Sequence, residues 1–104
     1  MIKHESPTVN ISMAGPAKSL VIHFNRVASD LMNLSSVVCL FRQEEIILRE
    51  AGLFDDNSHK VSVGTINNSK YKRIGISGAR DKEIFCGLYN IEKIDSEFIL
   101  TKVL

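Results

Sequence analysis

The residues that could carry out chemistry are few and lie far apart in the sequence. The chain of 104 residues contains three histidines and two cysteines: His4, His23, His59, Cys39 and Cys86. A hydrolase needs a nucleophile, a base and an orienting group brought together, and no pattern around these residues predicts such a group. Neither cysteine has the basic neighbours or the helix start that lower a thiol pKa. The sequence therefore predicts no catalytic residue, and we expect a protein that is not an enzyme.

Metal and cofactor sites are not predicted either. His59 follows Asp55 and Asp56, but the calcium-loop pattern of alternating acidic ligands, central glycine and terminal glutamate is missing. The glycines at 64, 75 and 78 fit neither a phosphate loop nor a dinucleotide fingerprint, because no helix is expected after them. Cys39 and Cys86 lie in apolar runs and are expected to be reduced, buried thiols, and two cysteines cannot form a zinc site alone.

Charge is unevenly distributed although the net charge is only +1. Residues 60–82 carry six cations and one acid, and Tyr71 lies between Lys70 and Lys72 in this segment. Residues 44–56 carry five acids and one arginine. Such charges can serve solubility alone, or they can bind phosphate groups by releasing counterions. The small net charge argues against a strongly basic nucleic-acid binder, so both interpretations stay open.

The elements that would position these residues are mostly strands. Alternating apolar and polar residues predict a first pair of strands at 9–13 and 20–24. Further strands are predicted at 37–42, 45–51, 61–66, 70–77, 84–94 and 98–103.

A single short helix, about residues 25–34, is predicted between the second and third strands. Asn25 is a good N-cap. The helical spacing places one set of residues on the buried face and another on the outer face. The buried set is Val27, Ala28, Leu31 and Leu34, and the outer set is Arg26, Ser29, Asp30 and Asn33.

These elements predict an α+β, mostly β fold for a single domain of residues 1–104. Strands this short favour a small barrel or two packed sheets of about eight strands. No internal repeat is visible. We expect a sheet of this size to leave an edge for a second copy to cover, and hence self-association. The longest apolar run, 37–41, is too short to span a bilayer, and residues 1–7 lack the apolar region of a signal peptide, so we expect a cytoplasmic protein.

One segment has a recognisable order of predicted elements. Residues 19–34 read SLVIHFNRVASDLMNL and residues 37–51 read VVCLFRQEEIILREA. This order of strand, short helix, strand, tight turn and strand resembles the half-barrel of the SpoVT/AbrB family of bacterial transition-state regulators and antitoxins. The resemblance implies that two chains exchange hairpins to complete one dimeric barrel, which binds DNA through basic side chains. The chain departs from the family pattern at Asn25, usually proline, and at Ser35-Ser36, usually Gly-Asp.

Candidate DNA-binding residues follow from the resemblance and from the charge pattern. The resemblance points to Lys18, Arg26, and Arg42 or Arg49. The basic segment adds Lys70, Tyr71, Lys72, Arg73 and Arg80. The favoured hypothesis is a non-enzymatic homodimer that binds DNA as a transcriptional regulator or antitoxin-like module. The alternatives are a protein-interaction module, such as a phage or mobile-element inhibitor or accessory subunit, and a structural oligomer.

Overall fold

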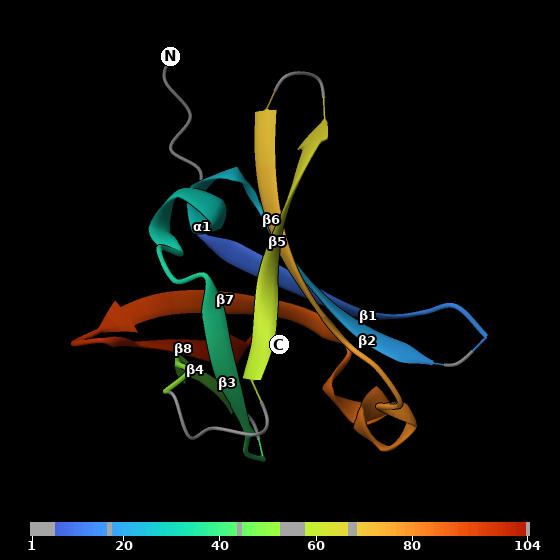
Figure 1. The fold of residues 1–104 in the computed structure, drawn as a ribbon. Coiled ribbons are helices and arrows are strands. Elements are labelled where there is room, and N and C mark those ends of the chain that lie inside the picture. The colour runs from blue at the N-terminus through green and yellow to red at the C-terminus, as the bar shows by residue number, and fades with distance from the viewer. Residues whose placement is uncertain (1–5, 17, 44, 53–57, 67–68, 104) are drawn as a thin grey trace.

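The strands of the chain pair in an unbroken ring, as a computed structural model shows (Figure 1). The structure describes residues 6–16, 18–43, 45–52, 58–66 and 69–103. In chain order the elements are β1 (Thr8–Ala14), β2 (Ser19–Phe24), α1 (Arg26–Leu31), β3 (Ser36–Phe41), β4 (Glu45–Glu50), β5 (Ser58–Ile66), β6 (Ser69–Ile76), the 3-10 helix η1 (Arg80–Phe85), β7 (Gly87–Ile94) and β8 (Glu97–Lys102). Around the ring the order is β1-β2-β6-β5-β3-β4-β8-β7, all antiparallel. The predicted α+β, mostly β fold is confirmed, in its barrel form.

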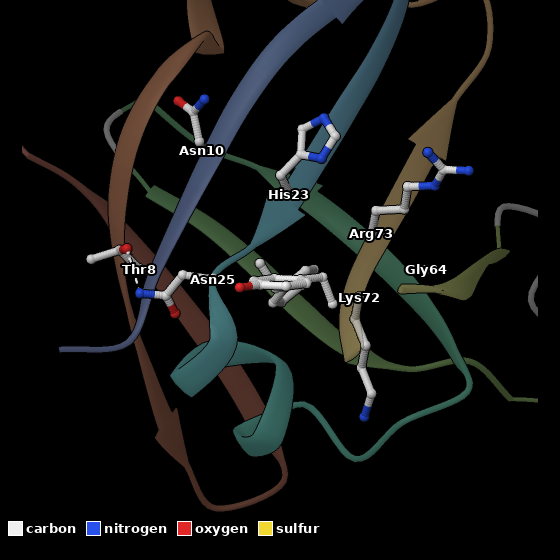
Figure 2. A pocket seen from close by; sticks show the side chains of 9 residues that line it. Thr8, Asn10, His23, Asn25, Gly64, Lys72 and Arg73 are labelled. Atoms are coloured by element: carbon white, nitrogen blue, oxygen red, sulfur yellow. Dashed lines mark hydrogen bonds between the residues drawn. The ribbon is translucent and has the colours of Figure 1, made fainter. Parts of the chain in front are cut away.

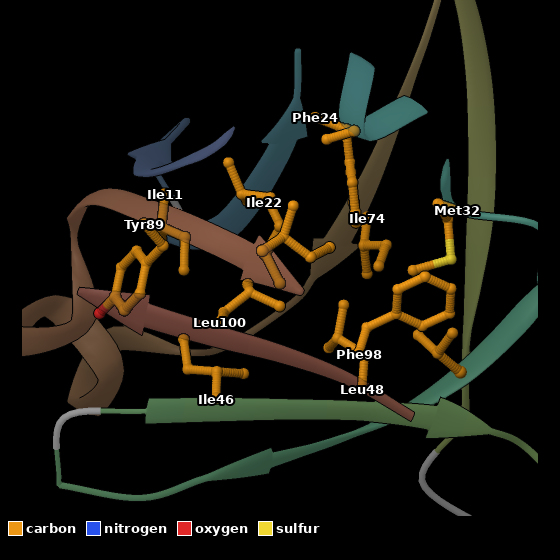
Figure 3. Packing of buried hydrophobic residues seen from close by; sticks show 14 of the residues in the cluster. Ile11, Ile22, Phe24, Met32, Ile46, Leu48, Ile74, Tyr89, Phe98 and Leu100 are labelled. Atoms are coloured by element: carbon orange, nitrogen blue, oxygen red, sulfur yellow. The ribbon is translucent and has the colours of Figure 1, made fainter. Parts of the chain in front are cut away.

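Alternation along β1, β2, β7 and β8 sends apolar side chains into the barrel (Figure 3). In β2, Leu20 and Ile22 are completely buried, whereas His23 between Ile22 and Phe24 is exposed. The largest fully buried side chains come from β1, β2, β4, β6, β7 and β8 and from the residue that follows α1. They are Tyr89, Phe24, Phe98, Ile11, Leu20, Ile22, Met32, Ile46, Leu48, Ile74, Leu100 and Val9. Such burial is the main favourable term in folding. No described helix has the length and apolar character that a membrane crossing requires.

The barrel consists of two interleaved halves with the same order of elements. Each half is a hairpin, a helix and a second hairpin: β1-β2-α1-β3-β4 and then β5-β6-η1-β7-β8. The strand order around the ring is unchanged when the halves are exchanged. Within a half the two hairpins do not pair with each other, because each pairs on both sides with hairpins of the other half. Neither half can therefore form its sheet alone.

The register between the halves identifies an approximate two-fold axis. The segment Glu45-Ile46-Ile47-Leu48 of β4 corresponds to Glu97-Phe98-Ile99-Leu100 of β8, and Ile47 pairs directly with its counterpart Ile99. On the opposite side of the barrel, Ile22 of β2 pairs with its counterpart Ile74 of β6. A structural repeat is thus present that the sequence analysis did not detect. The reason is that the two halves share apolar alternation and turn positions, but few identical residues.

The helix α1 begins as predicted but ends early. Asn25 caps it, with Oδ1 accepting a hydrogen bond from the Ala28 amide at 2.8 Å. The helix stops at Leu31 rather than near Leu34, because Met32 takes an extended conformation. Its buried residues are Ala28 and Ser29. The prediction that Ser29 faces outward is therefore wrong.

The second helical segment replaces part of a predicted strand. Ile84 was expected to begin a long strand, but residues 80–85 form η1 and β7 begins only at Gly87. The Phe85 ring packs against Phe41 at the end of β3, with ring centroids 4.9 Å apart. Lys82 lies above the Phe41 ring, with Nζ 5.1 Å from its centroid. This packing holds η1 against one end of the barrel, where η1 also contacts β1 and β2.

No described strand has a side that is wholly unpaired, but the β5–β6 hairpin extends beyond the ring: β5 pairs with β3 only through Ser58 to Lys60, and β6 pairs with β2 only through Arg73 to Ile76. β1 pairs with β7 through Thr8 to Ile11 and thereby closes the ring. Self-association is therefore not needed to close the barrel, although the edges of this hairpin remain open to a partner strand. We expect light scattering to give the mass of one chain, 11.6 kDa, because the ring of strands closes within a single chain. A stable dimer at micromolar concentration would contradict this expectation and restore the prediction from the sequence.

Candidate nucleic-acid interface

Two rows of outward-pointing side chains cross the neighbouring strands β1, β2, β6 and β5. In the first row, Asn10 is paired with His23, His23 with Arg73, and Arg73 with Ser62. The second row lies two residues further along each strand and contains Thr8, Asn25, Tyr71 and Gly64. Residues directly opposite each other on neighbouring strands have Cβ atoms about 5 Å apart. We call the surface formed by these two rows the β2–β6 face.

This face is hollowed into a pocket of about 480 Å³ (Figure 2). Its walls are Thr8, Asn10, His23, Phe24, Asn25, Gly64, Tyr71, Lys72 and Arg73. Part of the hollow arises at Gly64, which pairs with Tyr71 and carries no side chain. A Cβ added to Gly64 would meet only the Tyr71 carbonyl oxygen, at 4.0 Å. The volume is within the usual range of about 300 to 1,000 Å³ for small-molecule sites.

Asn25 forms one wall of the pocket by joining three segments of backbone. Its Nδ2 donates to the Ser6 carbonyl oxygen and to Thr8 Oγ1, both at 2.9 Å. Its Oδ1 accepts from the Ala28 amide. The side chain therefore ends β2, begins α1 and fixes the start of β1. With these bonds made, the role of Asn25 in the pocket is structural.

Ser29 connects α1 to β6 just beyond the point where the pairing of β2 with β6 ends. The Ser29 hydroxyl donates to the Phe24 carbonyl oxygen at 3.3 Å and accepts from the Lys72 amide at 2.9 Å. The ammonium of Lys72 donates to the Met32 carbonyl oxygen just beyond α1. A cation at this position also interacts favourably with the helix dipole. Figure 2 shows the Lys72 side chain extending along α1, away from Arg73.

The remaining polar groups of the pocket are available to a ligand. Within the described part of the chain, no hydrogen bond or ion pair holds the side chains of Asn10, His23, Tyr71 or Arg73. His23 and Arg73 are exposed, and Tyr71 is half-buried. Of the two cationic residues that line the pocket, Lys72 has its ammonium bound to the Met32 carbonyl oxygen and Arg73 has its guanidinium exposed, and no carboxylate is among the lining residues. Its electrostatic character thus favours an anionic ligand.

Other residues that the sequence singled out lie elsewhere. Lys18 is in the turn between β1 and β2, with a positive φ of 54°, at the far end of β2 from His23. Arg42 follows β3 and is exposed. Arg49 is half-buried on β4, and its Nη1 donates to the Glu50 carbonyl oxygen at 3.4 Å. These residues do not form one surface with the pocket.

The structure describes the side chains of some, but not all, of the remaining predicted DNA-binding residues. Arg26 is exposed in the first turn of α1, directly after the pocket residue Asn25. The side chains of Lys70 and Arg80 lie outside the described part of the structure. Tyr71, Lys72 and Arg73 are therefore the predicted residues that the fold brings together in the pocket.

Sequence reasoning missed the residues that β1 and β2 contribute to this pocket. Thr8, Asn10 and His23 are on the polar face of their strands, which the alternation pattern does indicate. Their convergence with Tyr71 and Arg73 depends on the pairing of β2 with β6. That pairing joins segments about fifty residues apart, and no local signal encodes it.

The cysteines and histidines considered for catalysis are the remaining groups whose position the structure describes in part. Burial raises the pKa of the Cys39 thiol to about 12, which keeps this sulfur protonated near neutral pH. Partial burial lowers the pKa of His59. Cys39 and Cys86 are both free and half-buried. The described residues include no cluster of three or more histidine, cysteine, aspartate or glutamate side chains suited to a metal ion. His4, Asp55 and Asp56 lie outside the described residues.

The pocket is thus the feature of the described surface in which aromatic, amide, imidazole and cationic groups meet. Comparison of the chain with protein-family models, with curated proteins and with solved structures finds no match.

Proposed function

We propose that the protein is a non-enzymatic regulatory protein that binds DNA through the β2–β6 face. The observation that carries this proposal is the convergence of Tyr71 and Arg73 with His23 in a pocket whose lining contains no carboxylate. Basic side chains near phosphates bind nucleic acid by releasing condensed counterions. Arg26 extends the cationic character beyond the pocket to the start of α1.

The interleaved halves agree with the arrangement that the resemblance to SpoVT/AbrB regulators implies. In those proteins two chains exchange hairpins to complete one barrel. Here β1 to β4 and β5 to β8 interleave in that manner, and one chain supplies both halves. This supports a role as a transcriptional regulator or antitoxin-like module. It also removes the need for a homodimer to complete the barrel.

Fluorescence anisotropy with labelled DNA tests the proposal directly. Arg73→Gln removes one exposed cation, and we expect it to lower the slope of log K against log salt concentration by about one. Arg42→Gln is the matched control. Arg42 is an exposed cation just after β3 and does not line the pocket, so its removal should leave DNA affinity nearly unchanged.

Two outcomes would contradict this proposal. One is the absence of binding to random duplex or single-stranded DNA at low salt and tens of micromolar protein. The other is an equal response of the Arg73→Gln and Arg42→Gln variants, which would mean that DNA does not contact the β2–β6 face preferentially.

A protein-interaction module is the second candidate, and exposed apolar side chains favour it. Ile84 of η1 is 76% exposed and Leu88 of β7 is 46% exposed. The two residues lie on either side of Cys86, where η1 ends and β7 is about to begin. Exposed apolar residues that form one contiguous patch are typical of docking surfaces. An inhibitor or accessory subunit encoded by a phage or mobile element would use such a surface, as would a structural oligomer.

A further inference from the structure

We propose that the pocket accepts one unpaired nucleotide, with its base against Tyr71 and its phosphate at Arg73. This inference rests on the proposed function and specifies the form of nucleic acid that the β2–β6 face recognises. A duplex keeps its bases stacked and presents a convex surface, whereas this face is hollow. A nucleotide that is out of the stack can enter a cavity of about 480 Å³.

Tyr71 provides the platform for the base. The residue is half-buried, and its partner across the strands, Gly64, has no side chain that could cover the ring. Aromatic side chains that bind single-stranded nucleic acid stack on successive bases and tolerate different sequences, because every base has a π-face.

Arg73 is placed to hold the phosphate of the same nucleotide. It points to the same side of β6 as Tyr71, two residues further along, and this spacing corresponds to about 6.6 Å. A base and its phosphate are separated by a similar distance. The exposed guanidinium can donate two parallel hydrogen bonds to phosphate oxygens.

Asn10 and His23 complete the site at the edge of the base. They lie in one row with Arg73, since Asn10 is paired with His23 and His23 with Arg73. The amide and the imidazole each provide both hydrogen-bond donors and acceptors. Figure 2 shows both side chains on the same side of the sheet as Arg73.

The position related to this pocket by the approximate two-fold axis shows which of its features are not general features of the fold. The two-fold relation between the halves places Ser19 in the position of Tyr71, Val21 in that of Arg73 and Gly75 in that of His23. The backbone pairing is the same on both sides of the axis. The aromatic, imidazole and guanidinium groups occur together on one side only, which indicates a specialised site.

The test uses fluorescein-labelled oligothymidylate and, separately, a labelled duplex of equal length. Tyr71→Ser introduces the residue found at the equivalent position, and we expect single-strand affinity to fall about 5- to 150-fold, the range for loss of one stacked base. Tyr71→Phe should retain affinity within about twofold, because it keeps the ring. Since stacking involves no counterion, the salt slope should be unchanged in Tyr71→Ser but smaller in Arg73→Gln.

Each outcome is decisive for one of the two proposals. Duplex binding that equals or exceeds single-strand binding, together with no effect of Tyr71→Ser, would overturn the nucleotide site but leave DNA binding by the β2–β6 face in place. Absence of binding to both probes would overturn the proposed function itself. Should Tyr71→Ser fail to fold, as judged by circular dichroism, Arg73→Gln carries the test, because the nucleotide site requires it to weaken single-strand binding more than duplex binding.

Discussion

Replacing Phe98 with alanine is expected to lower the free energy of unfolding by about 3 to 5 kcal/mol. The Phe98 side chain is completely buried, and its ring lies in the barrel interior near Met32 and Leu48 (Figure 3). Removal of the ring loses its transfer free energy and leaves a cavity, because strands tied on both sides cannot collapse into the space. The loss is measured by urea unfolding followed by circular dichroism.

Ile84→Ala is the control for this variant. Ile84 is 76% exposed on η1, so its truncation should change the free energy of unfolding by less than about 0.5 kcal/mol. A large loss for Ile84→Ala, or a small one for Phe98→Ala, would contradict the assignment of the core to the barrel interior.

Replacing Ser29 with alanine is expected to cost about 1 to 3 kcal/mol, although only one oxygen is lost. The hydroxyl bonds both the Phe24 carbonyl oxygen and the Lys72 amide, and Ser29 is only 3% exposed. Without it, the Lys72 N–H has no partner at the point where β6 leaves β2. The destabilisation should be accompanied by faster hydrogen exchange of the Lys72 amide, measured by NMR.

Asp30→Ala provides the comparison on the same helix. Asp30 is exposed next to Ser29, so its replacement should leave both the unfolding free energy and the Lys72 exchange rate nearly unchanged. If Ser29→Ala and Asp30→Ala behave alike, the hydroxyl does not connect α1 to β6.

The strands were predictable because alternation is a local property. The burial of residues along β1, β2 and β8 follows the two-residue period of a strand with one buried face. The start of α1 was equally local, since an asparagine side chain reaches the free amide of Ala28. Each of these features depends on residues within a few positions of one another.

The incorrect predictions concern residues whose conformation or burial depends on contacts with residues far away in the sequence. The apolar run Ile84, Phe85 and Cys86 predicts a strand. In the structure Phe85 instead ends the 3-10 helix η1, and its ring packs against Phe41. Ser29 has the character of a surface residue on a helix. In the structure it is buried against β6, where its hydroxyl accepts a hydrogen bond from the Lys72 amide, forty-three residues away.

The sequence by itself determined which residues alternate, where the helix begins and how charge is distributed along the chain. Tertiary structure alone decided that β2 pairs with β6 and that β1 meets β7, and these pairings create both the closed ring and the β2–β6 face. The physical reason is that the backbone groups of a strand can pair with any other strand. The choice of partner is made when the whole set of apolar faces, contributed by both halves, is buried together.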